Sequence, residues 1–101
     1  MNPRQLQQMA QQMQRQMQKI QAELANELVE GRAGSYVTVT MNGHREIRAI
    51  TIAPDVVDPN DIETLQDLIV AAITDASQKA QALTEQRMGP LAGGMKLPGM
   101  F

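Results

Sequence analysis

The chain has 101 residues, a formal net charge of −2 and no cysteine, so it can form one domain with a modest core but no disulfide or thiolate metal site. Only Tyr36 and Phe101 are aromatic, which excludes binding of single strands by stacking bases on aromatic side chains. No apolar run approaches the roughly 18 residues of a transmembrane helix, and the N-terminus lacks the apolar core of a signal peptide, so a cytoplasmic protein is expected.

Charge is distributed unevenly along the chain. The first 22 residues carry Arg4, Arg15 and Lys19 and no acidic residue, whereas residues 55–75 carry six acidic residues and no basic one. The C-terminal quarter is again slightly basic. The negative charge is therefore concentrated in one segment, and both ends of the chain are basic.

Residues 3–27 are predicted to form one long amphipathic helix, with Asn2 as its N-cap and Pro3 at its first position. Its apolar residues fall within an arc of about 100°; they are Leu6, Met9, Met13, Met17, Ile20, Leu24 and Leu28. The opposite face carries Arg4, Gln8, Gln11, Gln12, Arg15 and Lys19. At ~1.5 Å per residue this helix is nearly 40 Å long, whereas a compact domain of this size is about 30 Å across. We expect it to project beyond its own domain and to need a partner for its apolar stripe.

A three-stranded antiparallel sheet is predicted to follow. Residues 28–33 and 35–41 are typical of strands, and Asn42-Gly43 predicts a hairpin turn into a third strand at 45–52. The alternation of residues within the second and third strands decides the length of this turn, because a shift of one residue moves every side chain to the other face.

A two-residue turn would place Val37 and Val39 opposite charged residues, so a three-residue connection is favoured. It would pair Val39 with Ile47 and Val37 with Ala49. Tyr36, Ile50 and Ile52 would then lie on the other face. Both faces of the sheet would have apolar area, one for the helices of the same chain and one for a second subunit.

A second long helix is predicted over residues 59–88. Asp58 as cap, Pro59 at the first position and Asp61 at the third form a start signal, and Gly89-Pro90 is expected to end the helix. One face carries large apolar residues at its start and mostly alanine after Ala76. Residues 1–89 are thus predicted to be a single domain, followed by a flexible Gly/Pro-rich tail at 90–101.

No catalytic or metal-binding arrangement is evident. His44, the only histidine, lies beside the predicted turn. Asp55, Asp58 and Asp61 could suggest an oxygen-ligand metal site, but turn and helix-cap roles explain them better. No serine has a histidine placed to activate it. We expect no enzyme activity, no cofactor, no metal and no small-molecule substrate.

Three segments carry a family resemblance: ELVEGRAGSYVTVTMNGHREIRAITIAP at 27–54, DLIVAAITDASQKA at 67–80, and the late GGM at 93–95. In these the chain resembles the YbaB/EbfC family of small bacterial nucleoid-associated proteins. The resemblance implies an α+β fold of α-β-β-β-α order and an intertwined homodimer with projecting helical arms. It also implies binding of double-stranded DNA with little or relaxed sequence preference, in the nucleoid of the bacterial cytoplasm. The first helix departs from the family in being rich in glutamine rather than lysine.

On this resemblance the DNA-binding residues are predicted on the two helical arms; they are Arg4, Gln8, Gln12, Arg15, Lys19, Lys79 and Arg87. Arginine reaches phosphates or the minor groove, and glutamine amides donate to phosphates and base edges. The predicted action is clamping with bending or bridging of the duplex. The alternative is a dimeric adaptor or scaffold that binds a protein partner through its Met-rich helix. The basic ends of the chain favour DNA binding, whereas the negative net charge and the methionines of the first helix favour the adaptor function.

Overall fold

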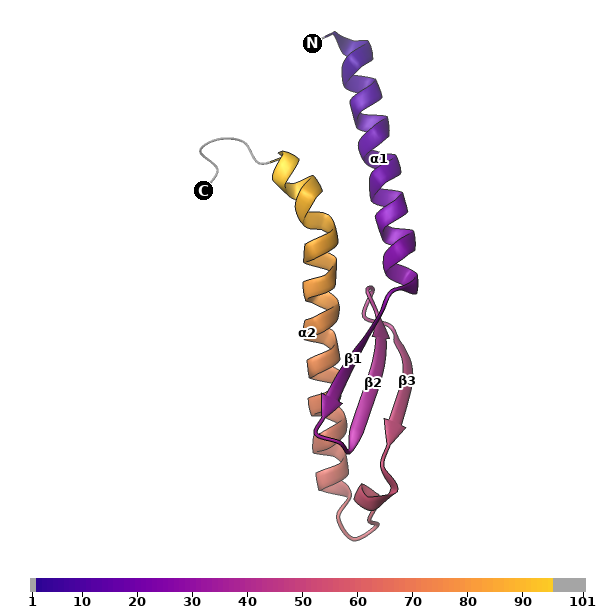
Figure 1. Cartoon of the computed structure of the whole chain (residues 1–101), viewed down its shortest axis with the longest axis vertical. Coiled ribbons are helices and arrows are strands. Elements are labelled where there is room, and N and C mark those ends of the chain that lie inside the picture. Colours follow the sequence, from indigo (N-terminus) through magenta and orange to yellow (C-terminus); the bar gives the residue numbers. More distant parts are fainter. Residues whose placement is uncertain (1, 96–101) are drawn as a thin grey trace.

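Residues 2–95 are described by the computed structural model, and their elements follow the order α-β-β-β-α. The helices are α1 (Pro3–Asn26) and α2 (Ile62–Met95), the strands are β1 (Leu28–Ala33), β2 (Val37–Asn42) and β3 (Ile47–Ile52), and a short 3-10 turn, η1, spans Pro54–Val56. The strands form one antiparallel sheet in the order β1-β2-β3. Figure 1 shows α2 along one face of the sheet and α1 continuing away from it, in a body of 70 × 29 × 16 Å. The predicted fold class is confirmed.

The start of α1 is fixed by its own first residues. Asn2 Oδ1 accepts a hydrogen bond of 2.8 Å from the Gln5 backbone N–H, and the Asn2 N–H donates to Gln5 Oε1 at 3.4 Å. This reciprocal pair is a capping box, which satisfies backbone donors that the helix itself cannot. Pro3 follows in the first turn, where no N–H is needed. The prediction of a helix beginning at residue 3 is confirmed.

The predicted pairing of β2 with β3 is wrong. Val39 lies opposite Ile50 and Val37 opposite Ile52, with a register shift between Thr40 and Met41. Residues 43–46 form the connection, so it is four residues long rather than three. Paired residues point to the same side of a sheet, so Ile50 and Ile52 share the face of the valines and do not lie on the opposite face.

The face of the sheet away from α2 is therefore mostly polar, with Leu28 and Ala49 as its apolar strand residues. The predicted placement of Ile50 and Ile52 on this face is wrong. Its central positions on β2 are Thr38 and Thr40, and Thr51 lies beside Thr38 on β3. On β1 the same face carries Glu30 and Arg32, which form an ion pair of 2.8 Å. Most of the apolar surface of the sheet therefore belongs to the face toward α2.

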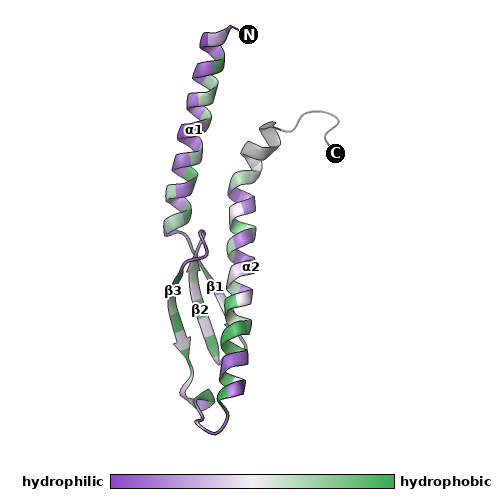
Figure 2. Ribbon diagram, turned by 180° about the vertical axis from the view of Figure 1, so that it is seen from behind, coloured by the Kyte–Doolittle hydropathy of each residue, from purple (hydrophilic) through white to green (hydrophobic). Residues whose placement is uncertain are grey.

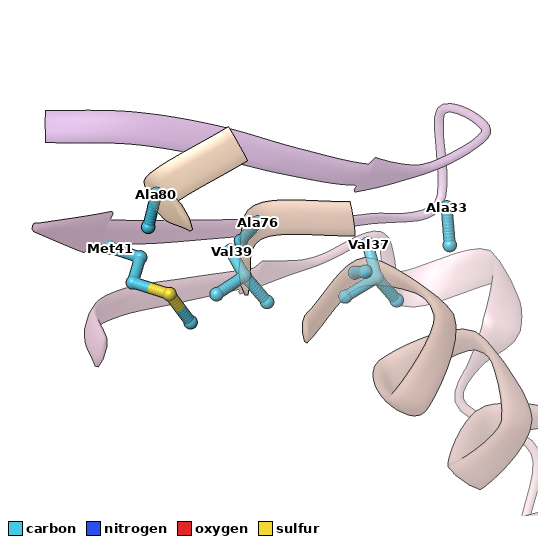
Figure 3. Packing of buried hydrophobic residues seen from close by; sticks show 7 residues of the cluster. Ala33, Val37, Val39, Met41, Ala76 and Ala80 are labelled. Carbon is cyan, nitrogen blue, oxygen red and sulfur yellow. The ribbon is translucent and has the colours of Figure 1, made fainter. Parts of the chain in front are cut away.

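The core lies between that apolar face and α2. Val37 and Val39 are completely buried and Met41 is 2% exposed, and they face Ala76 and Ala80 of α2 (Figure 3). Because α2 lies over β1 and β2 rather than β3, the apolar face is only partly covered. The alanine-rich part of α2 is thus the part that packs closely.

Gly31 allows the closest approach in this core. A Cβ atom at this position would lie 2.2 Å from the backbone N of Ala76 and 2.3 Å from the backbone O of Ala72. Alanines on the helix and glycine on the strand therefore bring the two backbones together, as small residues do wherever elements pack at short distance. Any larger residue would have to separate β1 from α2.

Two side chains of α2 cover the outer edge of β1. Asp75 Oδ2 accepts a hydrogen bond of 2.9 Å from the Arg32 N–H, and Lys79 Nζ donates to the Glu30 O at 2.8 Å. Lys79 also pairs with Asp75 at 3.0 Å. The hydrogen bond from the Arg32 backbone, followed by the bond from Lys79, holds the pKa of Asp75 below its usual value. The Arg32 N–H and the Glu30 O could otherwise pair with another strand, and these two side chains occupy them.

The boundaries of α2 differ from the predicted ones. The helix begins at Ile62 because Asp61, not Asp58, is its cap. Asp61 Oδ1 accepts a hydrogen bond of 3.3 Å from the Thr64 N–H. Asp58 instead stabilises the preceding turn by accepting a 2.9 Å bond from the Asn60 N–H. The helix also continues past Gly89-Pro90 to Met95, since a proline removes one donor and does not always end a helix. Of the predicted tail, residues 96–101 lie outside the described part of the chain.

We expect Gly31→Ala to destabilise the fold by at least about 3 kcal/mol, because the new methyl group meets backbone rather than a movable side chain. Gly89→Ala is the matched control. A Cβ there meets nothing within 4 Å, and alanine favours a helix by about 1 kcal/mol. Urea titration followed by circular dichroism should show the first midpoint fall and the second stay or rise. Equal midpoints for the two variants would contradict the close approach.

Candidate nucleic-acid interface

The exposed polar side of α1 is the candidate interface. It consists of Arg4, Gln8, Gln11, Gln12, Arg15 and Lys19, which we call the basic-amide face. All six residues are exposed, and α1 carries them beyond the sheet (Figure 1). Within the described residues 2–95, no side-chain hydrogen bond or ion pair involves any of them. Their donors and acceptors are therefore available to a ligand.

Four of these side chains surround a hollow. Gln8, Gln11, Gln12 and Arg15 line an open depression of about 420 Å³ on the helix surface. Residues at i, i+3, i+4 and i+7 lie side by side on a helix, so the depression follows directly from the sequence. It presents three amides, each able to donate and to accept, and one guanidinium group, which only donates.

The opposite side of α1 is apolar and largely uncovered. Leu6, Met9, Met13, Met17 and Ile20 form this Met stripe; Leu6 is 53% and Met9 50% exposed. Figure 2 shows hydrophobic and hydrophilic residues side by side around α1. Only at the base of the helix does the apolar side enter the body, where Leu24 is 1% exposed.

The β2–β3 turn and the start of β3 hold the C-terminal end of α1. The Gly43 N–H donates to Leu24 O at 2.9 Å, Arg48 donates to Ala25 O at 3.1 Å, and His44 Nε2 lies 2.8 Å from Gln21 O. The last carbonyl groups of a helix have no partner within it, so the turn supplies partners that the helix lacks. Gly43 is required there because a Cβ atom would lie 2.7 Å from Leu24 Cδ2.

Asn42 is the centre of this junction. It is fully buried, and its amide donates to Ala25 O at 3.1 Å and to Glu46 Oε1 at 2.7 Å. Its Oδ1 accepts from the backbone N–H groups of His44 and Glu46 at 3.0 and 2.9 Å. All the usual bonding capacity of the amide is thus used. One side chain closes the turn and ties it to α1.

The chain is similar to known proteins over nearly its whole length. The YbaB/EbfC DNA-binding family matches residues 1–95. A "Nucleoid-associated protein" of Roseiflexus castenholzii is 80% identical over 98% of this chain and 99% of that protein. Another protein of this name, from Chloroflexus aurantiacus, is 66% identical over 100% of both chains.

The chain belongs to the YbaB/EbfC DNA-binding family. The crystal structure of an uncharacterized protein from Helicobacter pylori is similar to it, with a TM-score of 0.73, 21% identity, and coverage of 94% of this chain and 97% of that one. At this identity the likeness shows a shared fold alone.

In this family member, the two basic residues predicted on α2 are already engaged. Arg87 pairs at 3.8 Å with Glu23 of α1 and also with Glu27, the C-cap residue of that helix. Lys79 is held by Asp75 and by the Glu30 O. Arg87 thus links the two helices, and either residue would have to give up its present partners to reach a phosphate. Of the seven predicted DNA-binding residues, the structure brings five together on α1.

Charge is separated along the long axis. Asp55, Asp58, Asp61, Glu63 and Asp67 lie around the connection from β3 into α2, at the end of the molecule opposite the N-terminus of α1 (Figure 1). Arg4 and Arg15 lie toward the N-terminal end. Polyanions are therefore attracted to one end and repelled from the other.

Neither a metal site nor a membrane span is found in the part of the chain that the structure describes. No group of three or more His, Cys, Asp or Glu residues there is placed to hold a metal ion. The helices of residues 2–95 are too polar or too short in apolar length to cross a bilayer.

We expect Asn42→Ala to destabilise the protein by about 3 kcal/mol, because it leaves the N–H groups of His44 and Glu46 without their acceptor and removes a buried donor to α1. Asn26→Ala is the matched control. Asn26 is exposed and makes one 3.3 Å bond to Ala22 O, so its loss should cost under about 0.5 kcal/mol. Thermal unfolding of both variants measures the difference. Equal losses would show that Asn42 is not the centre of the junction.

Proposed function

We propose that this protein is a nonenzymatic nucleoid-associated protein that binds duplex DNA as a homodimer, clamping it between the α1 arms and bending or bridging it. The observation that carries the proposal is the basic-amide face, exposed along a helix that projects from the body and is hydrogen-bonded at its base. Membership of a DNA-binding family and the names of close relatives support it.

The three cations of this face are the proposed phosphate contacts. Arg4, Arg15 and Lys19 lie on one side of α1 and have no partner among residues 2–95. Cations that neutralise phosphates release counterions, which gives affinity and makes it depend on salt. The acidic end of the molecule would point away from the DNA, so a net charge of −2 does not oppose binding through the arms.

Two uncovered apolar surfaces support the homodimer. One is the Met stripe of α1, and the other is formed by Ile47 and Ile50 of β3, which are 46% and 43% exposed on the face that α2 covers elsewhere. Large exposed apolar surfaces mark interaction sites. A second copy offers the same two surfaces in return, as a twofold interface requires. A pair of arms would also allow the molecule to hold DNA from two sides.

A protein-binding adaptor is the second candidate. Its support is the Met stripe, because methionine-rich helix faces adapt to different partners. The two functions differ in what covers the stripe: the second copy in the first case, a different protein in the other. They also differ in whether the basic-amide face is needed.

We expect the protein to sediment at low micromolar concentration as a particle of about twice 11.1 kDa. Met9→Lys with Met17→Lys should shift this species toward the monomer, because it places charge in the Met stripe. Gln7→Lys with Gln14→Lys adds the same charge beside the stripe and should leave the dimer intact. A folded wild-type monomer would remove the homodimer from the proposal.

We expect DNA affinity to depend strongly on salt. With three to six phosphates neutralised by one or two arms, log K should fall with log salt at a slope of about −3 to −5. Arg15→Ala with Lys19→Ala should weaken binding on every duplex alike and make the slope shallower by roughly two to four units. Fluorescence anisotropy titrations between ~50 and ~200 mM salt measure both effects.

The control for this pair removes two exposed cations from the body. Arg32→Ala with Arg45→Asn is suitable because asparagine tolerates the left-handed backbone at position 45, where φ is 62°. It should change affinity much less than the arm pair. If the body pair abolishes binding and the arm pair does not, the arms are not the DNA surface. If the wild type binds no duplex at ~50 mM salt, the adaptor function is the better one.

A further inference from the structure

We propose that α1 lies in the major groove and that Gln8, Gln11 and Gln12 read base edges there, in a hollow that spans about four base pairs and is completed by Arg15. The inference rests on the proposed function and adds sequence discrimination to it. It starts from the composition of the basic-amide face, where amides outnumber cations around the hollow.

Phosphate binding alone does not use what this face offers. A phosphate oxygen only accepts hydrogen bonds, so it can engage the NH₂ of a glutamine but not its carbonyl oxygen. Base edges in the major groove present donors and acceptors side by side, and a glutamine amide matches adenine N6 and N7 with both of its groups. With one guanidinium among three amides, the hollow is suited to base edges more than to the backbone of DNA.

The dimensions of α1 fit this placement. A helix about 10–12 Å wide enters a groove of about 12 Å. From Gln8 to Arg15 the helix rises about 10.5 Å, which corresponds to about three steps of ~3.4 Å along the duplex. Arg4 and Lys19 lie on the same face beyond the two ends of the hollow. They are about 22 Å apart, and would reach phosphates on the walls of the groove.

The residues of the hollow indicate what would be read. Glutamine pairs with adenine N6 and N7. The bound site should therefore contain adenine within a run of about four base pairs. The Met stripe faces the other way, so insertion in the groove leaves it available to a second copy.

The test begins with selection of bound duplexes from a randomised pool by the wild-type protein. We expect an enriched pattern of about four base pairs that contains adenine, bound roughly ten-fold more tightly than a scrambled duplex. Gln8→Ala with Gln12→Ala should abolish this preference and leave the salt slope unchanged, because it removes no charge.

Gln7→Ala with Gln14→Ala is the matched control, since both pairs are exposed glutamines of α1 but Gln7 and Gln14 do not line the hollow. It should keep the preference. Replacing the enriched adenine with 7-deazaadenine removes the N7 acceptor and should weaken binding of the wild type and the control about equally. It should not weaken the Gln8/Gln12 variant further.

Three outcomes overturn the inference while DNA binding stands. They are a wild type that enriches no pattern, a Gln8/Gln12 variant that keeps the preference, and insensitivity of the wild type to 7-deazaadenine. A wild type that binds no duplex at all overturns the proposed function together with it. The wild type could show no sequence preference while Arg15→Ala with Lys19→Ala still weakens its binding to every duplex. The arms would then bind phosphates only.

Discussion

The hydrogen bonds between the β2–β3 turn and the end of α1 determine what the arm can do. A helix that leaves its domain has no neighbours along most of its length, so its direction depends on its base. Here the base is fixed by Leu24, which is buried, and by the bonds from Asn42, Gly43 and Arg48 to the last carbonyl groups of the helix. Several bonds from different residues restrict rotation as well as separation. The arm is thereby coupled to the sheet, and the sheet to α2.

The body itself is held together by close approach rather than by large side chains. Gly31 and the alanines of α2 bring two backbones into contact, and Asp75 and Lys79 bridge α2 to the edge of β1. Small residues lose little side-chain entropy on burial, and backbone contact leaves few alternative packings. Arg87, paired with Glu23 and Glu27, adds a link between the two helices above the sheet.

Local signals in the sequence were sufficient for the elements and their order. Asn2 and Pro3 predicted the start of α1, and Asn42-Gly43 predicted the position of the hairpin. The register of that hairpin was not predictable from its own residues, because Asn42 and Gly43 are recruited by α1, about 17 residues earlier in the chain. Likewise, Asp58 and Asp61 are both residues that favour helix caps. Which of them caps α2 depends on the path of the turn before the helix.

In the candidate site, too, the features set by local sequence were predictable and the contacts between distant segments were not. The face of α1 follows from helical periodicity, so the grouping of Arg4, Gln8, Gln12, Arg15 and Lys19 could be predicted. The engagement of Arg87 could not, because its partners Glu23 and Glu27 are some 60 residues away and meet it only in the folded chain. No pattern in the sequence identifies Arg48 as a partner of α1, since its role depends on the bulge beside it.

The separation of charge along the molecule has a consequence for crowded DNA. A molecule 70 Å long that meets a duplex with its basic end presents its acidic end outward. Successive molecules along one duplex would thus build an outer layer with the same sign of charge as the DNA within it. Two duplexes coated in this way would repel each other at low ionic strength, and they would approach once salt shortens the range of that repulsion to about 10 Å or less.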